Sequence, residues 1–433
     1  MKEQAVNIFW FRRDLRVSDN HGLYRALTAG KPVLPVFIFD TIILNDLEDN
    51  DSRVTFILRQ VQKLQELFEQ RGSSFWIYHG RPIDAFKLLA SELLIDTVFA
   101  NQDYEPYAIA RDNHIETFLS SSGARMKLFK DHVLFHEDEV INNAGRPYTV
   151  FTPYRRKWKE KLTAADLQPF SSEKYLSNLL QLFPLKTYHH ADLGFRHGSF
   201  SVPPLILDTN VMESYASKRD FPASDGTSRL GVHLRFGTVS IRLVTALALS
   251  HSEAFLNELI WRNFYIDILW HFPHVVSGAF KTAYDNIQWV NSEKDFSRWC
   301  GGMTGFPIVD AGMRQLNETG YMHNRVRMIT ASFLCKHLLI DWRWGEAYFA
   351  EKLLDFELAS NNGGWQWAAG SGCDAAPYFR IFNPTLQMKK FDPDKEFVHK
   401  WVPELETPRY PRPVVDLKLA RERALKAYQK ALT

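Results

Sequence analysis

The first predicted strand of the chain is Val6-Asn7-Ile8-Phe9-Trp10-Phe11, an apolar run that passes directly into the charged loop Arg12-Arg13-Asp14-Leu15-Arg16. A short run of aromatic and β-branched residues with one polar side chain predicts a buried strand. No G-x-G-x-x-G follows it, so the usual dinucleotide fingerprint is absent. Open α/β sheets bind ligands at the carboxyl ends of their strands. The charged loop is therefore either part of a ligand site or a solvated loop with internal ion pairs.

Further strand-like runs and helical periodicities follow in the same part of the chain. The strand-like runs lie at 33–39, 75–78 and 97–100, and the helical periodicities at 52–70 and 83–94. Strands that alternate with amphipathic helices predict βαβ units around a parallel sheet. We therefore predict a doubly wound α/β domain over residues 1–130.

The rest of the chain has a different character. Residues 131–204 are interrupted by prolines and carry a basic run at 155–159, which is typical of a solvated face. From about residue 211 to residue 358 the apolar spacing turns helical, with little β-branched alternation. We predict a connector over 131–204 and an all-helical domain over 205–433, so that the fold class is α/β plus all-α.

Composition limits the class of protein. The 433 residues carry a formal net charge of +2, 45% hydrophobic residues and 12 tryptophans, which predicts a globular protein of more than one domain. Three separated cysteines argue against a disulfide framework, and no His, Cys or Asp spacing predicts a metal site. No apolar run approaches the roughly 20 residues of a membrane span, and the N-terminus has no signal-peptide pattern. We expect no membrane association and a cytoplasmic location.

A helix expected over 255–271 places four unlike side chains on one face. Glu258, Trp261, Arg262 and Tyr265 are spaced at i, i+3, i+4 and i+7, which brings them into one stripe. Water rarely surrounds a tryptophan, and a core rarely takes an unpaired glutamate or arginine. The stripe is either a cavity wall that stacks a flat ligand and hydrogen-bonds its edge, or a structural Glu–Arg pair beside a half-buried tryptophan.

A second helix is expected to start within Met322-His323-Asn324-Arg325-Val326-Arg327-Met328. Its spacing places Asn324 and Arg325 near Met328, a soft side chain suited to a flat apolar partner. The two arginines of the segment supply positive charge for phosphate groups. His323 is expected to be a buried core histidine, since no metal-ligand spacing surrounds it.

Two further stretches have compositions found at binding sites. Asn361-Asn362-Gly363-Gly364-Trp365-Gln366-Trp367 sets two tryptophans two residues apart behind a glycine pair. One indole can point into the protein and the other towards a cavity, and the alternative is a tryptophan-rich core turn. The loop 226–231, Gly-Thr-Ser-Arg-Leu-Gly, precedes a predicted helix. Its hydroxyl and N–H groups form either an anion site or a capping loop.

Together, these stretches resemble the DNA photolyase/cryptochrome family, and within it the class I cyclobutane pyrimidine dimer photolyases of bacteria. The resemblance rests on motifs that follow one order along nearly the whole chain, at 9–16, 226–230, 255–262, 305–314, 322–325, 361–369 and 374–384. It implies an N-terminal α/β antenna domain, a connector and a C-terminal helical domain that binds FAD. It also implies a monomeric protein whose partner is UV-damaged DNA with cyclobutane pyrimidine dimers.

The resemblance also assigns roles to single residues. Those expected to bind FAD are Tyr215, Thr227, Ser228, Arg229, Leu230, Gly231, Asn324, Arg327, Asp355, Phe356, Glu357 and Asn361. Those expected to bind DNA and the lesion are Glu258, Trp261, Arg262, Tyr265, Asn324, Arg325, Met328, Trp367 and Gln387. Those expected to act in catalysis are Glu258 and Asn361, with Trp365, Trp342 and Trp289 as an electron-transfer chain to FAD.

The activity that the resemblance implies is light-dependent DNA repair by a carbon–carbon lyase. Reduced FAD, excited by blue light, donates an electron to a flipped-out dimer, which splits into two pyrimidines and returns the electron. Two alternatives stay open: a cryptochrome-like flavoprotein that signals without repair, and a helical protein whose aromatic side chains stack nucleic-acid bases. The amide of Asn361 and the indole of Trp367 resemble repair enzymes rather than signalling cryptochromes.

Three positions depart from the family pattern. Gly231 removes a hydroxyl, and Glu357 replaces an aspartate, among the residues expected at FAD. Ala108 stands in the place of the glutamate that binds the antenna folate, so the resemblance does not predict a folate. A second, antenna chromophore is left as a deazaflavin, a flavin or none.

Overall fold

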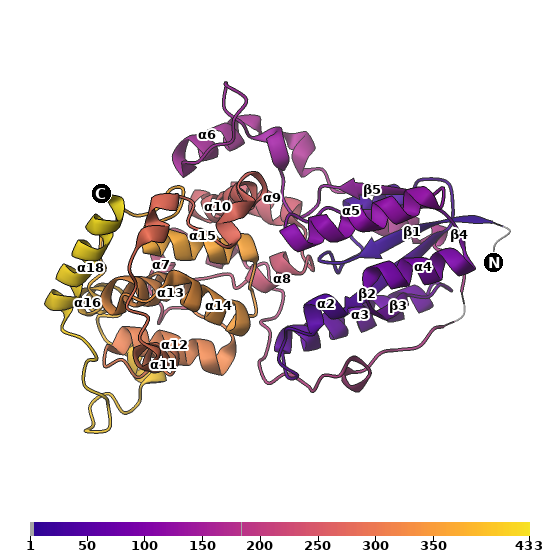
Figure 1. Ribbon diagram of the computed structural model, residues 1–433. Helices are drawn as coiled ribbons and strands as arrows, with labels where there is room; N and C mark the ends of the chain where they lie inside the picture. The colour runs from indigo at the N-terminus through magenta and orange to yellow at the C-terminus, as the bar shows by residue number, and fades with distance from the viewer. Residues whose placement is uncertain (1–3, 183) are drawn as a thin grey trace. The chain divides into compact units, whose positions relative to one another are not determined.

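The computed structural model of the protein describes residues 4–182 and 184–433, so that residues 1–3 of the predicted first domain and residue 183 of the connector lie outside the described residues. The chain divides into two compact units (Figure 1). The first, here called the sheet unit, comprises Met1–Glu139, Lys161–Ile206 and Leu230–Leu247. The second, the helical unit, comprises Val140–Glu160, Leu207–Arg229 and Ala248–Thr433. Parts of the predicted connector fall in each unit, and its boundaries stay a prediction.

The sheet unit is built on five parallel strands in the order β3-β2-β1-β4-β5, which confirms the predicted α/β fold class. The strands are β1 (Ala5–Phe11), β2 (Val33–Asp40), β3 (Trp76–Gly80), β4 (Leu94–Asn101) and β5 (Arg125–Phe129). In this register Phe9 of β1 lies beside Pro35 of β2 and Phe99 of β4. The sequence pattern does not predict β5, because this edge strand is short and none of its side chains is fully buried.

Helices alternate with these strands, and those at residues 52–69 and 82–92 lie where the sequence predicts helical periodicity. The helices are α1 (His21–Leu27), α2 (Thr41–Leu44), α3 (Ser52–Glu69), α4 (Pro82–Glu92) and α5 (Pro106–Ser121). Asp51 caps α3 by accepting from the backbone N–H of Arg53 at 2.8 Å, and the apolar stripe of this helix is buried. Consecutive residues of β1 are buried from Val6 to Phe11, which requires cover on both faces of the sheet.

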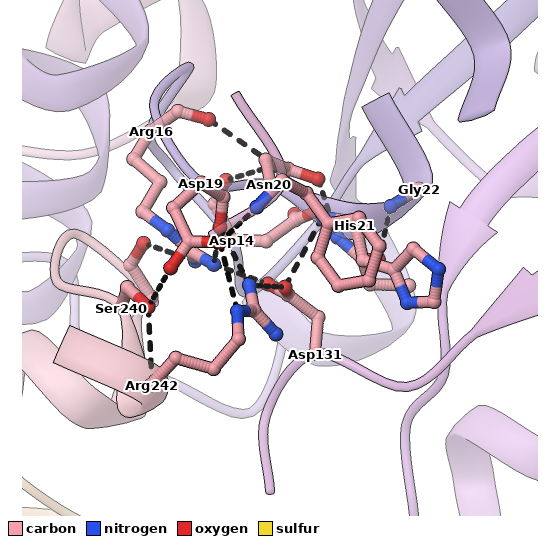
Figure 2. A network of polar contacts seen from close by, with 12 residues as sticks. Asp14, Arg16, Asp19, Asn20, His21, Gly22, Asp131, Ser240 and Arg242 are labelled. Carbon is pink, nitrogen blue, oxygen red and sulfur yellow. Dashed lines mark hydrogen bonds and ion pairs between the residues drawn. The ribbon is translucent and has the colours of Figure 1, made fainter. Parts of the chain in front are cut away.

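Internal ion pairs hold the charged loop that follows β1 (Figure 2). Asp131 accepts from Arg16 at 2.6 Å and from Arg242 at 2.7 Å, and its side chain is 0% exposed. Asn20 donates to the carbonyl oxygens of Asp14 and Arg16, and it caps α1. Burial by itself would raise the pKa of Asp131, but the two guanidinium groups hold this pKa below its usual value. Of the two alternatives for the loop, internal ion pairs are present, although the loop is largely buried rather than solvated.

The helical unit confirms the predicted all-α part of the fold. Its helices are α6 (Phe151–Lys161), α7 (Thr209–Lys218), α10 (Glu253–His271), α11 (Glu293–Cys300), α12 (Pro307–Thr319), α13 (Asn324–Ser332), α14 (Trp342–Lys352), α15 (Leu358–Ala369), α16 (Pro384–Phe391), α17 (Glu396–Trp401) and α18 (Leu417–Leu432). The last residue of α6 falls in the sheet unit, as does α8 (Gly231–Arg235), and α9 (Ile241–His251) begins there.

Shorter helices complete the chain. A π-helix, Phe333–Leu338, follows α13 directly. The 3-10 helices are Glu137–Glu139, Ala164–Leu167, Ser172–Asn178, His190–Leu193, Pro273–Val276 and Thr282–Asn286. Over residues 4–182 and 184–433, no helix is long and apolar enough to cross a bilayer.

Two glycines let α15 pack closely against its neighbours. A Cβ atom on Gly345 of α14 would lie 2.1 Å from Cη2 of Trp365, and one on Gly363 would lie 2.2 Å from Cδ1 of Tyr265 in α10. Neither distance leaves room for a side chain. The side chain of Gln366 also donates to the carbonyl of Val275 at 3.0 Å. These contacts fix the rotation of α15 about its own axis and so decide which of its residues face each neighbour.

Replacing Asp131 with asparagine should lower the free energy of unfolding by about 3–5 kcal/mol, because the buried guanidinium of Arg16 loses its carboxylate and that of Arg242 keeps only its pair with Asp19. The measurement is urea unfolding followed by circular dichroism. The difference in unfolding free energy from the wild type should narrow as the pH falls below about 4, since a carboxylate with a lowered pKa contributes fully above its unfolded pKa and loses this contribution as the pH falls towards its folded pKa.

The matched control is Asp96→Asn, since Asp96 pairs with Lys31 at 2.5 Å but is 30% exposed. This substitution should cost less than about 1 kcal/mol. If Asp131→Asn lowered the free energy of unfolding by no more than Asp96→Asn does, the buried pairs of Asp131 would not have the predicted role in the sheet unit.

Candidate functional site

A cavity of about 420 Å³ lies within the helical unit, bordered by α10, α13, α14, α15 and the segment between the last two. This volume is in the range of small-molecule sites. Many of the residues that the sequence assigns to FAD or to the lesion border it: Glu258, Trp261, Arg262, Tyr265, Asn324, Arg327, Met328, Asp355, Phe356, Glu357, Asn361, Trp365 and Trp367. Apolar walls come from Phe349 and Leu353, to which the sequence assigned no role.

The four-residue stripe of α10 faces this cavity, as the first of its two interpretations expects. Its tryptophan is covered on one face by α6, since Trp261 stacks on Phe151 with ring centroids 3.7 Å apart and planes 7° from parallel. α6 is anchored on α10 because the Tyr154 hydroxyl donates to the Asp267 carboxylate at 2.6 Å. The position of the Trp261 ring is therefore set by a helix that the sequence pattern places within the connector.

The glutamate and the arginine of the stripe do not pair with each other. Glu258 Oε1 lies 2.5 Å from Nη1 of Arg219, and Arg262 Nη2 lies 2.7 Å from Oε1 of Glu357. Both charges of the stripe are therefore paired beside a half-buried Trp261, but with residues outside the stripe, so the structural Glu–Arg pair considered from the sequence does not form within it. Arg219, whose guanidinium lies 5.1 Å from the ring centroid of Tyr215, is a site residue that the sequence reasoning missed. No local pattern joins it to Glu258, because the two residues belong to different helical segments.

A third ion pair borders the cavity between α13 and the segment before α15. Nη2 of Arg327 lies 3.0 and 3.1 Å from the two carboxylate oxygens of Asp355, which is the pair that the resemblance leads us to expect. Nε of Arg327 donates to the carbonyl of Met322 at 2.7 Å. Three hydrogen bonds to fixed acceptors leave this guanidinium little freedom, so that it presents a rigid polar edge to the cavity.

The amide of Asn361 has a defined orientation. Its Nδ2 donates to Oε1 of Glu346 at 2.8 Å and to the Glu346 carbonyl at 3.1 Å. Burial raises the pKa of the Glu346 carboxyl, and the hydrogen bond from Asn361 opposes part of that rise. Because both donor contacts go to Glu346 and no described residue donates to the amide oxygen, this oxygen is the group that Asn361 offers to a ligand.

The two tryptophans of α15 differ in their surroundings. Trp365 is 2% exposed, and its ring centroid lies 5.0 Å from Phe349 and 6.0 Å from Trp299, both at steep angles. Trp367 is half-buried, and its nearest described ring is Phe382 at 6.3 Å. Both border the cavity, but only Trp365 belongs to the core of the unit. Neither a core turn nor a single cavity-facing indole describes the segment fully.

The other members of the expected electron chain lie in or against the same core as Trp365. Trp342 is 2% exposed within this core, and Trp289 is half-buried against it. Trp299 has no place in the sequence prediction although it contacts Trp365. Its indole N–H donates to the carbonyl of Thr330 at 3.2 Å, near the start of the π-helix, where regular α-helical pairing ends.

Several predicted residues do not border the cavity. Within the helical unit these are Tyr215, Thr227, Ser228, Arg229, Trp289, Arg325, Trp342 and Gln387. Leu230 and Gly231 belong to the sheet unit. Arg325 pairs with Asp220 at 2.6 Å and donates to Sδ of Met328 at 3.7 Å, so it touches the cavity wall through that thioether. Thr227 lies 3.2 Å from the hydroxyl of Tyr321, which keeps the loop 226–229 close to the segment before α13.

His323 is a buried capping residue, as expected of a core histidine. It is 3% exposed, and its Nδ1 accepts from the backbone N–H of Arg325 at 3.2 Å at the start of α13. Burial and the nearby charge of Arg327 lower the pKa of His323 to about 4. Among the described residues, no three His, Cys, Asp or Glu side chains come together as a metal site.

Because His323 caps α13 in its neutral form, the free energy of unfolding depends on pH. Since its pKa falls to about 4 on folding, His323 contributes fully above the unfolded value of about 6.5, and its contribution is lost as the pH falls towards 4. The unfolding free energy of the wild type should therefore exceed that of His323→Ala, which has no capping side chain, near pH 7, and the difference should shrink at about pH 5. Urea unfolding at the two pH values measures it. A difference that does not change with pH would contradict the role of the neutral imidazole.

The chain is similar to known proteins over nearly its whole length. Residues 255–409 match the FAD binding domain of DNA photolyase, and residues 7–173 match DNA photolyase. A deoxyribodipyrimidine photo-lyase of Synechococcus is 38% identical over 93% of this chain and 88% of that protein. The crystal structure of a bacterial class III photolyase from Agrobacterium tumefaciens gives a TM-score of 0.86 at 34% identity, covering 100% of this chain and 98% of that chain. An archaeal photolyase from Sulfolobus tokodaii, solved with two FAD molecules, gives a TM-score of 0.80 at 32% identity, covering 98% and 99%.

Proposed function

Because this chain belongs to the DNA photolyase/cryptochrome family, we propose that it is a deoxyribodipyrimidine photo-lyase, an enzyme that repairs UV-damaged DNA in light. Its cofactor is FAD, and its substrate is a cyclobutane pyrimidine dimer. The single observation that carries this proposal is the cavity of about 420 Å³ that joins an ion-paired edge, an oriented amide and several aromatic rings. When bound and reduced, FAD supplies an electron to the dimer under blue light and takes it back after the ring has opened.

The cavity fits FAD on the chemistry of its walls. Phe349, Leu353 and Met328 offer an apolar surface for a flat ring system, and the pair of Arg327 and Asp355 offers donors and acceptors for its polar edge. The oxygen of Asn361 can accept a hydrogen bond from a ring N–H group. Thr227, Ser228 and Arg229 would hold the phosphates from a loop beside α13, and Tyr215 would lie with them.

A pyrimidine dimer has to leave the base stack of the DNA duplex before it can reach this cavity. This extrusion costs a few kcal/mol, and less for a damaged base. Stacking on Trp261 and Trp367 would offset about 1–3 kcal/mol per aromatic contact. Glu258 is held by Arg219 at 2.5 Å, so its carboxylate is placed to hydrogen-bond the edge of a flipped base. Arg325 and Gln387, outside the cavity, would contact the DNA beside it.

The tryptophans of the unit would supply the electrons that restore reduced FAD. We assign this role to Trp365, Trp342 and Trp289 in that order, starting from the residue that borders the cavity. The role rests on the resemblance to the family and on the burial of Trp365 and Trp342 in one core.

Finer assignments complete the proposal. Class I is the subgroup that the sequence motifs favour, and the similarity to a class III photolyase makes class III the alternative. The archaeal relative with two FAD molecules favours a flavin among the antenna chromophores considered. The protein would act as a cytoplasmic monomer. A cryptochrome-like signalling role is the second candidate, and the oxygen of Asn361 and the ring of Trp367 favour repair over it.

Blue light should restore two thymines from an oligonucleotide with one thymine cyclobutane dimer when the purified protein carries reduced FAD. Chromatography of the oligonucleotide measures the restored strand. The dark reaction and an oligonucleotide with a (6-4) photoproduct should show no restoration. A protein that binds and photoreduces FAD but restores nothing would support the signalling role, and restoration of the (6-4) product would overturn the lesion class.

Trp365→Phe should slow the photoreduction of oxidised FAD at least about tenfold, because an indole is easier to oxidise than a phenyl ring, and it should spare repair by enzyme reduced beforehand. Absorption spectroscopy under blue light measures the first, and the oligonucleotide assay the second. The matched control is Trp76→Phe on β3, a half-buried tryptophan of the sheet unit that should change neither rate. Equal losses of photoreduction and repair would contradict the division of roles.

A further inference from the structure

Four glycines lie inside α12, α14 and α15, and three of them are explained by close packing. A Cβ atom would lie 2.3 Å from Val326 at Gly312, 2.1 Å from Trp365 at Gly345 and 2.2 Å from Tyr265 at Gly363. Each of these glycines allows another side chain to occupy the space where its own would be. Their presence in helices, where glycine is unfavourable, therefore has a reason within the folded chain.

Close packing does not explain the glycine at position 364. A Cβ atom at this position would meet nothing within 4 Å, and the residue is exposed although it lies in the middle of α15. Its φ angle does not lie in the left-handed region, so the backbone does not require glycine either. Glycine is nevertheless among the least favourable residues inside a helix. The absence of a side chain at Gly364 is therefore not required by the fold of the chain.

The position of Gly364 indicates what does require it. The residue borders the 420 Å³ cavity, with Asn361 three residues before it and Trp367 three residues after it, and both of these also border the cavity. Residues three apart lie one above the other on a helix face. The cavity wall formed by α15 thus has an amide at one end, an indole at the other and bare backbone between them.

We propose that Gly364 is a cofactor-positioning residue, kept without a side chain so that the flat ring system of FAD lies directly against the backbone of α15. This inference rests on the proposed function, since it takes FAD as the ligand of the cavity. Carbon atoms in contact lie about 3.5–4 Å apart, so a single methyl group occupies the layer in which the ring would lie. A side chain at this position displaces the ring, whereas a larger side chain elsewhere on the wall could turn away.

The absence of a side chain at Gly364 also affects the reaction. A ring held against Gly364 lies between the Asn361 oxygen and the Trp367 indole, that is, between the group that can accept from a ring N–H and the group assigned to the flipped base. Close contact with the backbone fixes the ring in one plane, and a fixed plane sets its distance from the lesion side of the cavity. Gly364 would therefore affect the position of the cofactor as well as its affinity.

The test compares Gly364→Ala and Gly364→Leu with the matched variant Gly363→Ala. Gly364→Ala should keep or raise the melting temperature of the FAD-depleted full chain, by about 1–3 °C, since alanine favours helices and a Cβ atom meets nothing within 4 Å. Both substitutions at Gly364 should weaken FAD binding, at least about tenfold for alanine and beyond detection for leucine, measured by flavin fluorescence on titration. Gly363→Ala should lower the melting temperature of the depleted chain, because Tyr265 has to move.

The outcomes separate this inference from the proposed function. Wild-type affinity for FAD in both Gly364 variants would overturn the inference and leave the proposed function intact. A lower melting temperature of the FAD-depleted Gly364→Ala variant would also overturn it, because the glycine would then serve the fold. Failure of the wild-type protein itself to bind FAD would remove the proposed function and, with it, the ligand on which the inference rests.

Discussion

The close approach of α15 to α14 and α10 is the constraint on which the rest of the helical unit depends. It exists because Gly345 gives its space to the ring of Trp365 and Gly363 gives its space to Tyr265. An α-helix turns by about 100° per residue, so a helix fixed at two such contacts has no freedom to rotate. With its rotation fixed in this way, α15 directs a third face, which carries Asn361, Gly364 and Trp367, to the cavity.

The charged side chains around the cavity occur as ion pairs. Three arginines border it, and each faces a carboxylate: Arg219 with Glu258, Arg262 with Glu357 and Arg327 with Asp355. Paired charges present directional donors and acceptors but little net potential. Such a wall suits a nearly neutral ring or a flipped base better than a phosphate group. The phosphates of a cofactor or of DNA therefore have to be met outside this wall, which agrees with the place of Thr227, Ser228 and Arg325 beyond it.

The parts of the structure that could be predicted from the sequence are those set by local spacing. Apolar runs and amphipathic periods give the central strands and the long helices, and spacing on α10 gives the stripe from Glu258 to Tyr265. The missed parts depend on contacts between distant segments. β5 is an exposed edge strand without a clear pattern, and α6 has few apolar residues because only one face of it is buried. Arg219 meets Glu258, and Trp299 meets Trp365, only after folding.

Gly363 and Gly364 show why the composition of a motif cannot replace its geometry. They are identical neighbours, yet the rotation of about 100° between them sends one against Tyr265 and the other to the cavity. The first is needed by the fold, and the fold does not need the second. The same rotation separates Asn361, which borders the cavity, from Asn362, whose side chain donates to the Val275 carbonyl at 2.9 Å. In each pair one residue packs against the fold and the other borders the cavity. Gly364 costs helix stability without any gain in packing, so the ligand proposed for the cavity, and not the fold, accounts for it.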